Sequence, residues 1–371
     1  MEINTQLKRY YAYSFVSNLV STGSFTMPYF FLHGFSIYDV ILTILVYGVT
    51  CLVILRPIIN LVGIIGIKKT FLLHIVASVI MLVIALNVNP QHKYLFFLWQ
   101  FMNAFVVMLC RIPLNAYFSR FGDIGNRGKE FSYGIIAQNL AAIIAVVFLG
   151  KLIDKTGLHI FLVIQTITII IAALILWGSD GDDMKIAIPT EVKKEDVPLR
   201  VRRAYLYSRL PYAFNKDMLV IWITILMGKF VLTGIYFAIT IVSQMIVSYL
   251  AGYFSDKGTI KKVFYVAVAL TAFLWLFIPF VRFSFDVFLL QFILGVSNLV
   301  VETPVEREYY NLAKLSGNDL GFSWVREWSI QSGIVLSCLL TLVLVFFVKQ
   351  WQYLLLLGAF YPLALTLIFN R

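Results

Sequence analysis

Residues 100–113 read QFMNAFVVMLCRIP, and residues 291–304 read QFILGVSNLVVETP. Both stretches begin with Gln-Phe and end with a proline thirteen positions after the glutamine. The residues between these fixed points are mostly apolar, with a few polar residues at similar places. The two stretches are 191 positions apart, and so long a period indicates the duplication of a unit that contains several elements.

Shorter matches recur at nearly the same offset along the chain. Ile67-Lys68-Lys69 matches Ile260-Lys261-Lys262, Gly125-Asn126 matches Gly317-Asn318, and Phe131-Ser132 matches Phe322-Ser323. In a chain this hydrophobic, the repeats predict that one bundle of membrane helices has been duplicated. A duplicated helical bundle is typical of carriers whose two halves move about a central site.

The composition indicates a protein that lies within a membrane. Hydrophobic residues make up 60% of the 371 positions and charged residues only 13%, unlike a soluble domain. Backbone groups in hydrocarbon must be hydrogen-bonded within their own segment, so we expect helices of about 20 apolar residues and no open sheet. The N-terminus does not resemble a cleavable signal peptide. The three cysteines lie in apolar runs, and no pattern predicts a disulfide, a metal site or a cofactor.

We therefore predict an all-α polytopic membrane protein with twelve transmembrane helices in two pseudo-symmetric six-helix bundles. The first bundle is residues 1–177, the second is residues 217–371, and a cytoplasmic connector at 178–216 joins them. The predicted spans are 10–32, 37–60, 70–89, 94–116, 132–151, 158–177, 218–235, 237–255, 263–281, 285–305, 325–348 and 350–369. The seventh span stays open, because a start at Met218 leaves little length for two passes before Ser255. It is short or broken, or it begins earlier and brings Lys216 and Asp217 into the membrane.

The distribution of basic residues predicts the orientation. Lys and Arg are concentrated in the segments that share a side with Met1, including the connector, and are sparse in the others. Because cytoplasmic loops carry the excess of basic residues, we expect both termini in the cytoplasm. The same bias accounts for the net charge of +11, so nucleic-acid binding is not needed to explain it.

Two polar stripes are the first candidates for a functional site. Helical spacing places Gln100, Asn103, Arg111 and Asn115 on one face of the fourth span, and Gln291, Asn298, Glu302 and Glu306 on one face of the tenth. Arg111 and Glu302 occupy equivalent positions with opposite charge. We predict that these faces look toward each other and that Arg111 pairs with Glu302 when the cytoplasmic side is closed. Polar residues that line a path or gate are favoured over a permanent polar interface.

Further candidates lie on other helices, and several of them leave two interpretations open. Asn18, with Ser14, Ser21 and Thr22, forms a stripe that either faces the path or serves close helix packing. Gln138 and Asn139 lie on the fifth span. Arg326 and Glu327 lie on the eleventh span, where they either form a gate or reach the cytoplasmic surface. Arg56 either pairs with an acid, meets an anionic substrate or reaches the surface. His74 is interpreted as a packed histidine.

The chain resembles the major facilitator superfamily, a large family of twelve-helix secondary transporters. The family's loop signature is recognisable in the second half at Gly252, Asp256, Lys257 and Gly258, followed by Lys261-Lys262, and it is one residue shorter than usual. In the first half Gly66-Ile67-Lys68-Lys69 remains, but Gly63 stands where the family has an aspartate. The resemblance implies alternating access, in which the inner halves of helices 4 and 5 close against those of helices 10 and 11.

The resemblance makes a carrier of a small organic solute or amphiphile the leading functional hypothesis, with proton coupling as an option through Glu302 or Glu306. A flippase for lipids or lipid-linked substrates and a receptor or assembly protein without transport are the alternatives. No nucleotide-binding, zinc-protease or hydrolase motif is present, so we do not expect an enzyme. We expect a monomer in the cell membrane, in contact with membrane lipids, with a bacterial inner membrane as the favoured location.

Overall fold

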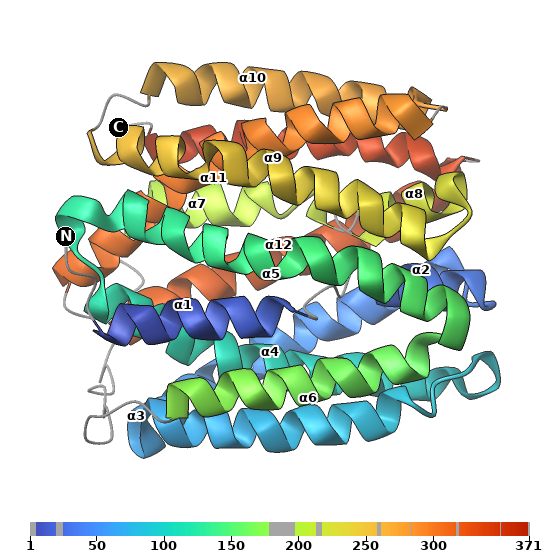
Figure 1. The fold of residues 1–371 in the computed structure, drawn as a ribbon, viewed down its shortest axis with the longest axis horizontal. Helices are drawn as coiled ribbons and strands as arrows, with labels where there is room; N and C mark the ends of the chain where they lie inside the picture. The colour runs from blue at the N-terminus through green and yellow to red at the C-terminus, as the bar shows by residue number, and fades with distance from the viewer. Residues whose placement is uncertain are drawn as a thin grey trace.

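The computed structural model is helical throughout the residues that it describes. These residues are 5–19, 25–177, 197–212, 217–257, 261–282, 284–316, 319–348 and 350–369, and no β-strand occurs among them. The helices run side by side along the long axis, and both chain ends lie at the same end of the bundle (Figure 1). We call this the inner end. The opposite end, where Lys93 pairs with Asp39 at 2.7 Å, is the outer end.

The order of elements follows the sequence-based expectation of long helices with short connections. The α-helices are α1 (Thr5–Asn18), α2 (Thr26–Leu32), α3 (Ile37–Ala85), α4 (Lys93–Phe121), α5 (Arg127–Thr156), α6 (Leu158–Trp177), α7 (Leu199–Ser208), α8 (Leu219–Met227), α9 (Phe230–Asp256), α10 (Lys261–Phe277), α11 (Ser284–Ser316), α12 (Asp319–Phe347) and α13 (Phe360–Leu365). The 3-10 helices are η2 (Pro90–His92), η3 (Ile124–Asn126), η6 (Ile278–Phe280), η7 (Trp351–Ala359) and η8 (Thr366–Phe369).

Eight helices in the described part of the chain are long and apolar enough to cross a membrane. One of them, α3, contains 49 residues and would extend about 70 Å if it were straight, far more than a bilayer core of about 30 Å. Gly66 interrupts it with a left-handed φ of 82°, which glycine adopts without a steric penalty. The predicted second and third spans are therefore the two arms of α3.

The predicted seventh span, 218–235, is wrong at its outer end. Gly228 adopts φ 69° and ends α8 after nine residues, and α9 begins at Phe230. A helix of nine residues reaches only about 14 Å, so α8 cannot cross a membrane alone. The structure shows a broken element instead, with α7 preceding α8 and packing against α12 and α13. The first predicted span is also divided, into α1 and α2; Ser21 and Thr22 lie outside the described residues.

Helices α5 and α9 form an antiparallel pair in which each helix caps the other. At the inner end, the carboxylate of Asp256 accepts hydrogen bonds from the backbone N–H groups of Gly128 (2.8 Å) and Lys129 (3.0 Å). At the outer end, Asp154 accepts hydrogen bonds from the N–H groups of Phe230 and Val231, both at 3.0 Å. Carboxylates at helix N-termini satisfy free N–H groups and interact favourably with the helix dipole. This pair therefore joins the two parts of the chain at both ends.

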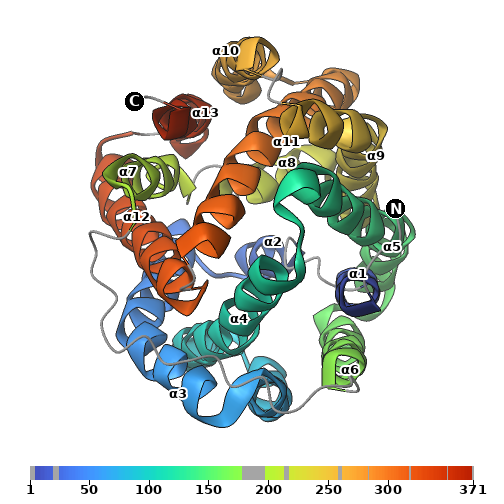
Figure 2. The same cartoon turned by 90° about the vertical axis from the view of Figure 1, so that its left-hand side faces the viewer.

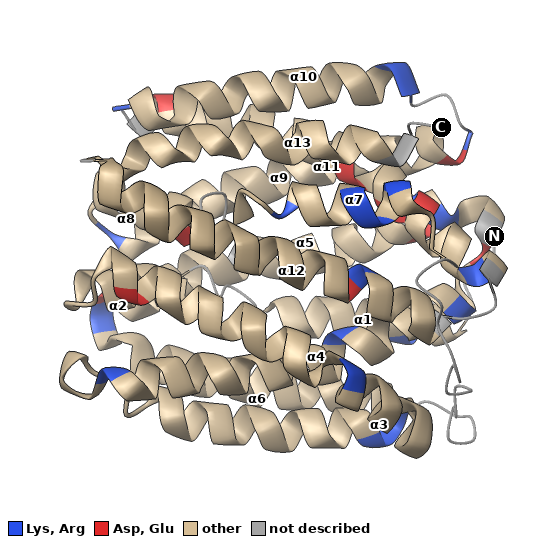
Figure 3. Cartoon of the chain, turned by 180° about the vertical axis from the view of Figure 1, so that it is seen from behind, with Lys and Arg blue, Asp and Glu red and all other residues tan. Residues whose placement is uncertain are grey.

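Three further helix contacts connect the first and second parts of the chain around the centre of the molecule. α3 packs against α12, α4 packs against α12, and α11 packs against α5. Viewed from the inner end, the helices surround a central region bordered by α2, α4, α11 and α12 (Figure 2). Charged residues gather at the two ends of the bundle, and a smaller group lies inside it on α4, α7, α11 and α12 (Figure 3). That internal group contains the candidate site.

Candidate functional site

A cavity of about 400 Å³ lies between α1, α3, α4 and α6 and is bordered by residues next to α7 and α8. Its wall is partly apolar, with Ile44, Val106 and Leu114 among the lining residues. The polar and aromatic groups on the wall are Tyr13, Ser17, Tyr47, His74, Asn103, Arg111, Gln165, Tyr212 and Asp217. A cavity that combines apolar wall residues with converging polar groups is a usual form of a small-molecule site.

Arg111 on α4 connects this cavity to a chain of charged residues on the inner side. Its side chain is 42% exposed, and its Nη1 lies 3.3 Å from a carboxylate oxygen of Glu327 on α12. Glu327 is fully buried and also accepts a hydrogen bond from the amide of Asn115 at 3.5 Å. The carbonyl oxygen of that amide accepts a hydrogen bond from the Tyr310 hydroxyl at 3.1 Å. These contacts connect α4 to both α11 and α12.

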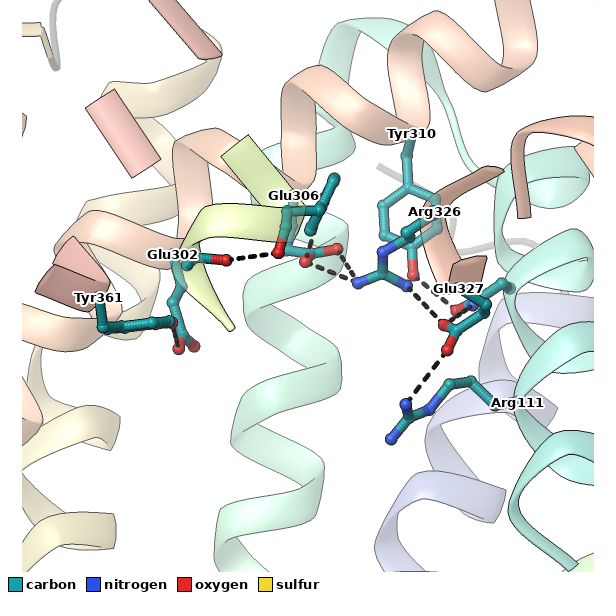
Figure 4. A network of polar contacts seen from close by, with 10 residues as sticks. Arg111, Glu302, Glu306, Tyr310, Arg326, Glu327 and Tyr361 are labelled. Atoms are coloured by element: carbon teal, nitrogen blue, oxygen red, sulfur yellow. Dashed lines mark hydrogen bonds and ion pairs between the residues drawn. The ribbon is translucent and has the colours of Figure 1, made fainter. Parts of the chain in front are cut away.

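Arg326 extends this series of charged residues toward α11 and α7. Its Nη2 donates to both carboxylate oxygens of Glu306, at 2.7 and 2.8 Å, and its Nη1 lies 3.9 Å from Glu327 (Figure 4). The guanidinium also lies over the rings of Tyr205 and Tyr309, at 5.2 and 4.7 Å, where cation–π attraction supplements the ion pairs. We call Arg111, Glu327, Arg326 and Glu306 the inner ion network.

The predicted pair between Arg111 and Glu302 is not formed in this structure. Arg111 pairs with Glu327, and Glu302 accepts a hydrogen bond from the Tyr361 hydroxyl of α13. Helical spacing assigned both residues to the polar faces of α4 and α11, and both faces lie inside the bundle. It could not show that α12 presents a nearer acid to α4, because side-chain spacing within one helix carries no information on its neighbours.

Burial decides between the interpretations left open for Arg326 and Glu327. Their side chains are 11% and 0% exposed, so neither reaches the inner surface. Arg56, by contrast, is exposed and has no ion pair among the described residues; its guanidinium lies over the Trp324 ring at 5.9 Å.

The remaining polar candidates divide into paired and unpaired groups. Asn103 donates to Gln100 at 2.7 Å, so these two residues of the α4 stripe satisfy each other beside the cavity. Gln291 donates to Thr240 at 2.5 Å and accepts a hydrogen bond from Tyr236, which joins α11 to α9.

Four candidates have no role in the inner ion network. Among the described residues, the Asn18 amide bonds to Ser14 and Ser17 on its own helix. Asn139 and Asn298 each have a buried amide atom with no hydrogen-bond partner in the described part of the chain, and Gln138 is half-buried on α5.

The loop motif predicted from the family resemblance acts at the junction of α5 and α9. Asp256 caps α5 and also lies 3.2 Å from the Nε of Arg307. Gly252 allows close approach, because a Cβ built on it would lie 2.6 Å from the Gly128 carbonyl oxygen. Lys257 lies over the Tyr253 ring at 4.3 Å. Gly258 is outside the described residues.

Several cavity residues were not singled out from the sequence. Tyr47, Tyr212 and Gln165 lie on the wall, and among 20 tyrosines no sequence signal distinguishes the first two. His74 borders the cavity, but its Nδ1 lies 2.9 Å from the Val106 carbonyl and its ring is buried, in agreement with a packed histidine. Asp217 had a usable signal, because it is an acid beside an apolar run.

These features define a multi-pass membrane protein with an internal polar cavity and an ion network beside it. The profile of the Major Facilitator Superfamily matches residues 10–305, and the chain belongs to this superfamily of membrane transporters. Among solved structures, the chain is similar to the crystal structure of the nucleoside transporter NupG. The TM-score is 0.64 and the identity 15%, with 99% of this chain and 100% of that chain covered, so the similarity shows a shared fold. No match was found among curated proteins.

Proposed function

We propose that this protein is a secondary transporter that moves a small polar organic solute by alternating access. The observation that carries the proposal is that Arg111 belongs to both the cavity wall and the inner ion network. Its guanidinium lines the cavity and also pairs with Glu327, which belongs to the contact between α4 and α12. A group placed in this way can sense an occupied cavity and change the contact that closes the inner side.

The chemistry of the cavity indicates the class of solute. A guanidinium has several N–H donors in a planar fork, and Arg111 uses one nitrogen for Glu327 while its side chain stays 42% exposed. A solute with a carboxylate or carbonyl acceptor matches the remaining donors. Tyr47 and Tyr212 offer ring faces and hydroxyl groups on the same wall. Because the fold resembles that of a nucleoside transporter, nucleosides belong among the first solutes to be tested.

Competition for Arg111 supplies a mechanism for opening. A bound acceptor attracts the guanidinium and weakens its pair with Glu327, which is fully buried. Glu327 then keeps its ion pair with Arg326 at 3.9 Å, and Arg326 keeps its ion pair with Glu306 at 2.7 Å. The second part of the chain therefore keeps its own ion pairs while its contact with α4 weakens. Ligand binding shifts a conformational equilibrium when the ligand has different affinities for the two states.

Glu302 is the proposed site of proton coupling. It has no ion pair with any described residue, whereas Glu306 and Glu327 each contact an arginine within 4 Å. Tyr361 donates to it, Arg209 lies 5.9 Å from the Tyr361 ring, and Glu306 is one helical turn away. Protonating Glu302 therefore breaks no ion pair with a described residue. Protonating Glu327 weakens its pairs with Arg111 and Arg326, and protonating Glu306 removes the nearest carboxylate from the buried Arg326.

The inner end is proposed to face the cytoplasm, with twelve passes arranged in two halves joined by the connector that begins at 178. Because α7 packs against α12 and α13, we assign it to the second half and place the end of the connector near Val197. We propose a monomer in the bacterial inner membrane.

Uptake by proteoliposomes tests the function. Purified protein is reconstituted and supplied with labelled nucleosides, organic acids, amino acids and sugars, with and without a pH gradient. We expect saturable uptake of at least one acceptor-bearing solute, which Arg111→Ala abolishes and Arg120→Ala, at the exposed inner end of α4, leaves intact. Uptake that depends on the gradient in the wild type and not in Glu302→Gln supports proton coupling. Translocation of a fluorescent lipid with no solute uptake would favour a flippase.

A further inference from the structure

A groove lies between α7 and α12, outside the central cavity. Its volume is about 190 Å³, and Leu199, Leu206, Trp324 and Trp328 line it together with Arg202 and Arg203. Leu199 is 49% exposed and Trp328 is 40% exposed, so the groove opens at the surface of the bundle. At its other end the two helices meet closely, because a Cβ on Gly333 would clash with the Leu206 carbonyl.

The arginines of this groove are not balanced by acids. Arg202 and Arg203 form no ion pair with any described residue. Arg56 of α3 is outside the lining and also has no such pair, and its guanidinium lies over the Trp324 ring at 5.9 Å. The Nε of Arg202 is buried, with no hydrogen-bond partner among the residues that the structure describes. By contrast, the nearby Arg200 pairs with Glu308 at 3.5 Å. The groove therefore combines an apolar floor with positive charge that lacks a counterion in the described part of the chain.

The groove lies beside the first turns of α12, near the inner end of the bundle. Trp324 and Trp328 follow the start of α12 at Asp319 by about 8 and 14 Å of helix. Tryptophan is enriched at membrane interfaces, and basic residues beside the membrane attract the anionic lipids of the cytoplasmic leaflet. We propose that this groove binds an anionic phospholipid, with its phosphate at Arg202 and Arg203 and an acyl chain along Trp324 and Trp328.

A bound lipid of this kind contacts α7 and α12 together and holds them against each other. α7 is a short helix of ten residues whose main neighbours are α12 and α13. A ligand that binds only the folded state stabilises it in proportion to its occupancy. The proposal concerns the lipid surface of the protein and does not depend on which solute is transported.

The test is lipid titration of delipidated full-length protein in detergent. Dioleoylphosphatidylglycerol and dioleoylphosphatidylcholine have the same chains and differ in net charge. Native mass spectrometry counts bound lipids, and thermal unfolding reports stabilisation. We expect the wild type to prefer the anionic lipid, and Arg202→Gln/Arg203→Gln to reduce its affinity for that lipid by roughly 30-fold. The charge-conserving Arg202→Lys/Arg203→Lys should retain most of the preference, and Arg120→Gln, which removes an inner-end arginine outside the groove, should leave it unchanged.

The outcomes separate the alternatives. Inorganic phosphate at millimolar concentration should not displace the lipid, because it lacks the chain that contacts the tryptophans; displacement would show a phosphate site instead. Trp328→Ala should weaken the binding of both lipids. Equal affinity of the wild type for the two lipids would overturn the proposal, as would a preference for the anionic lipid that survives in the double glutamine variant.

Discussion

The contact between Arg111 and Glu327 makes a quantitative prediction for the opening of the inner end. Arg111→Ala removes the cation 3.3 Å from a carboxylate that is fully buried, whereas Glu327→Ala leaves behind an arginine that is 42% exposed to the cavity. A buried charge that has lost a partner is destabilised far more than a partly solvated one. We therefore expect Arg111→Ala to perturb the closed state more than Glu327→Ala, although the remaining contact with Arg326 at 3.9 Å reduces the difference.

The expected magnitude follows from the partial exposure of the pair. Residues in one ion-pair network couple by about 0.5–3 kcal/mol. Because Arg111 is nearly half exposed, we expect a coupling of about 1–2 kcal/mol, equivalent to a change of roughly 5–30-fold in the ratio of closed to open protein. The double variant should be less perturbed than the sum of the two single variants, because it leaves neither charge without its partner.

The assay is a double-mutant cycle on the conformational equilibrium. Spin labels at positions 120 and 315, at the inner ends of α4 and α11, report opening of the inner side in a background without native cysteines. Lys93→Ala is a matched control, because it breaks a pair of 2.7 Å at the outer end. Strict additivity, or an inner distance distribution unchanged in Arg111→Ala, would refute a role for this pair in closure.

Three further predictions concern the helix pair and the orientation. Gly128→Ala should destabilise the protein by about 1–3 kcal/mol in thermal unfolding, because its Cβ would lie 2.7 Å from a backbone oxygen of α9; Gly125→Ala, with 3.7 Å to its nearest neighbour, should be nearly neutral. Equal effects would contradict the close packing of α5 and α9. Asp154→Ala should lower stability by about 0.5–2 kcal/mol through two lost caps, and an unchanged midpoint would argue against them. Single cysteines at positions 195 and 92 should react with an impermeant reagent from the cytoplasmic and the external side, respectively; reversed labelling would invert the proposed topology.

The repeat and the apolar spans made the helical membrane fold predictable, because both are properties of the local sequence. A broken seventh span was one of the open interpretations, but the position of the break at Gly228 was not predictable for a physical reason. Residues 218–235 are almost continuously apolar, and hydropathy cannot distinguish a helix that ends at a left-handed glycine from one that passes through it.

The charged residues that form the site were predictable from the sequence, but the partner of each residue in the ion pairs was less so. Arg111, Glu306, Arg326 and Glu327 were all recognised as charges within apolar spans, and the structure places them in one network. The partner of Arg111 depends on how α12 is rotated against α4, which is a tertiary property. Tyr47 and Tyr212 could not be found at all, because an aromatic residue in a membrane helix has the same sequence signature at a cavity as at the lipid surface.

Counterflow in proteoliposomes tests the central claim most directly. Vesicles are loaded with an unlabelled solute that raises the thermal stability of the protein, and entry of the labelled solute is followed without any ion gradient. Alternating access predicts transient accumulation above equilibrium that is saturable in the wild type and lost in Arg111→Ala. If no solute of the panel shows counterflow, or if accumulation is undiminished in Arg111→Ala, then Arg111 does not couple an occupied cavity to opening of the inner end.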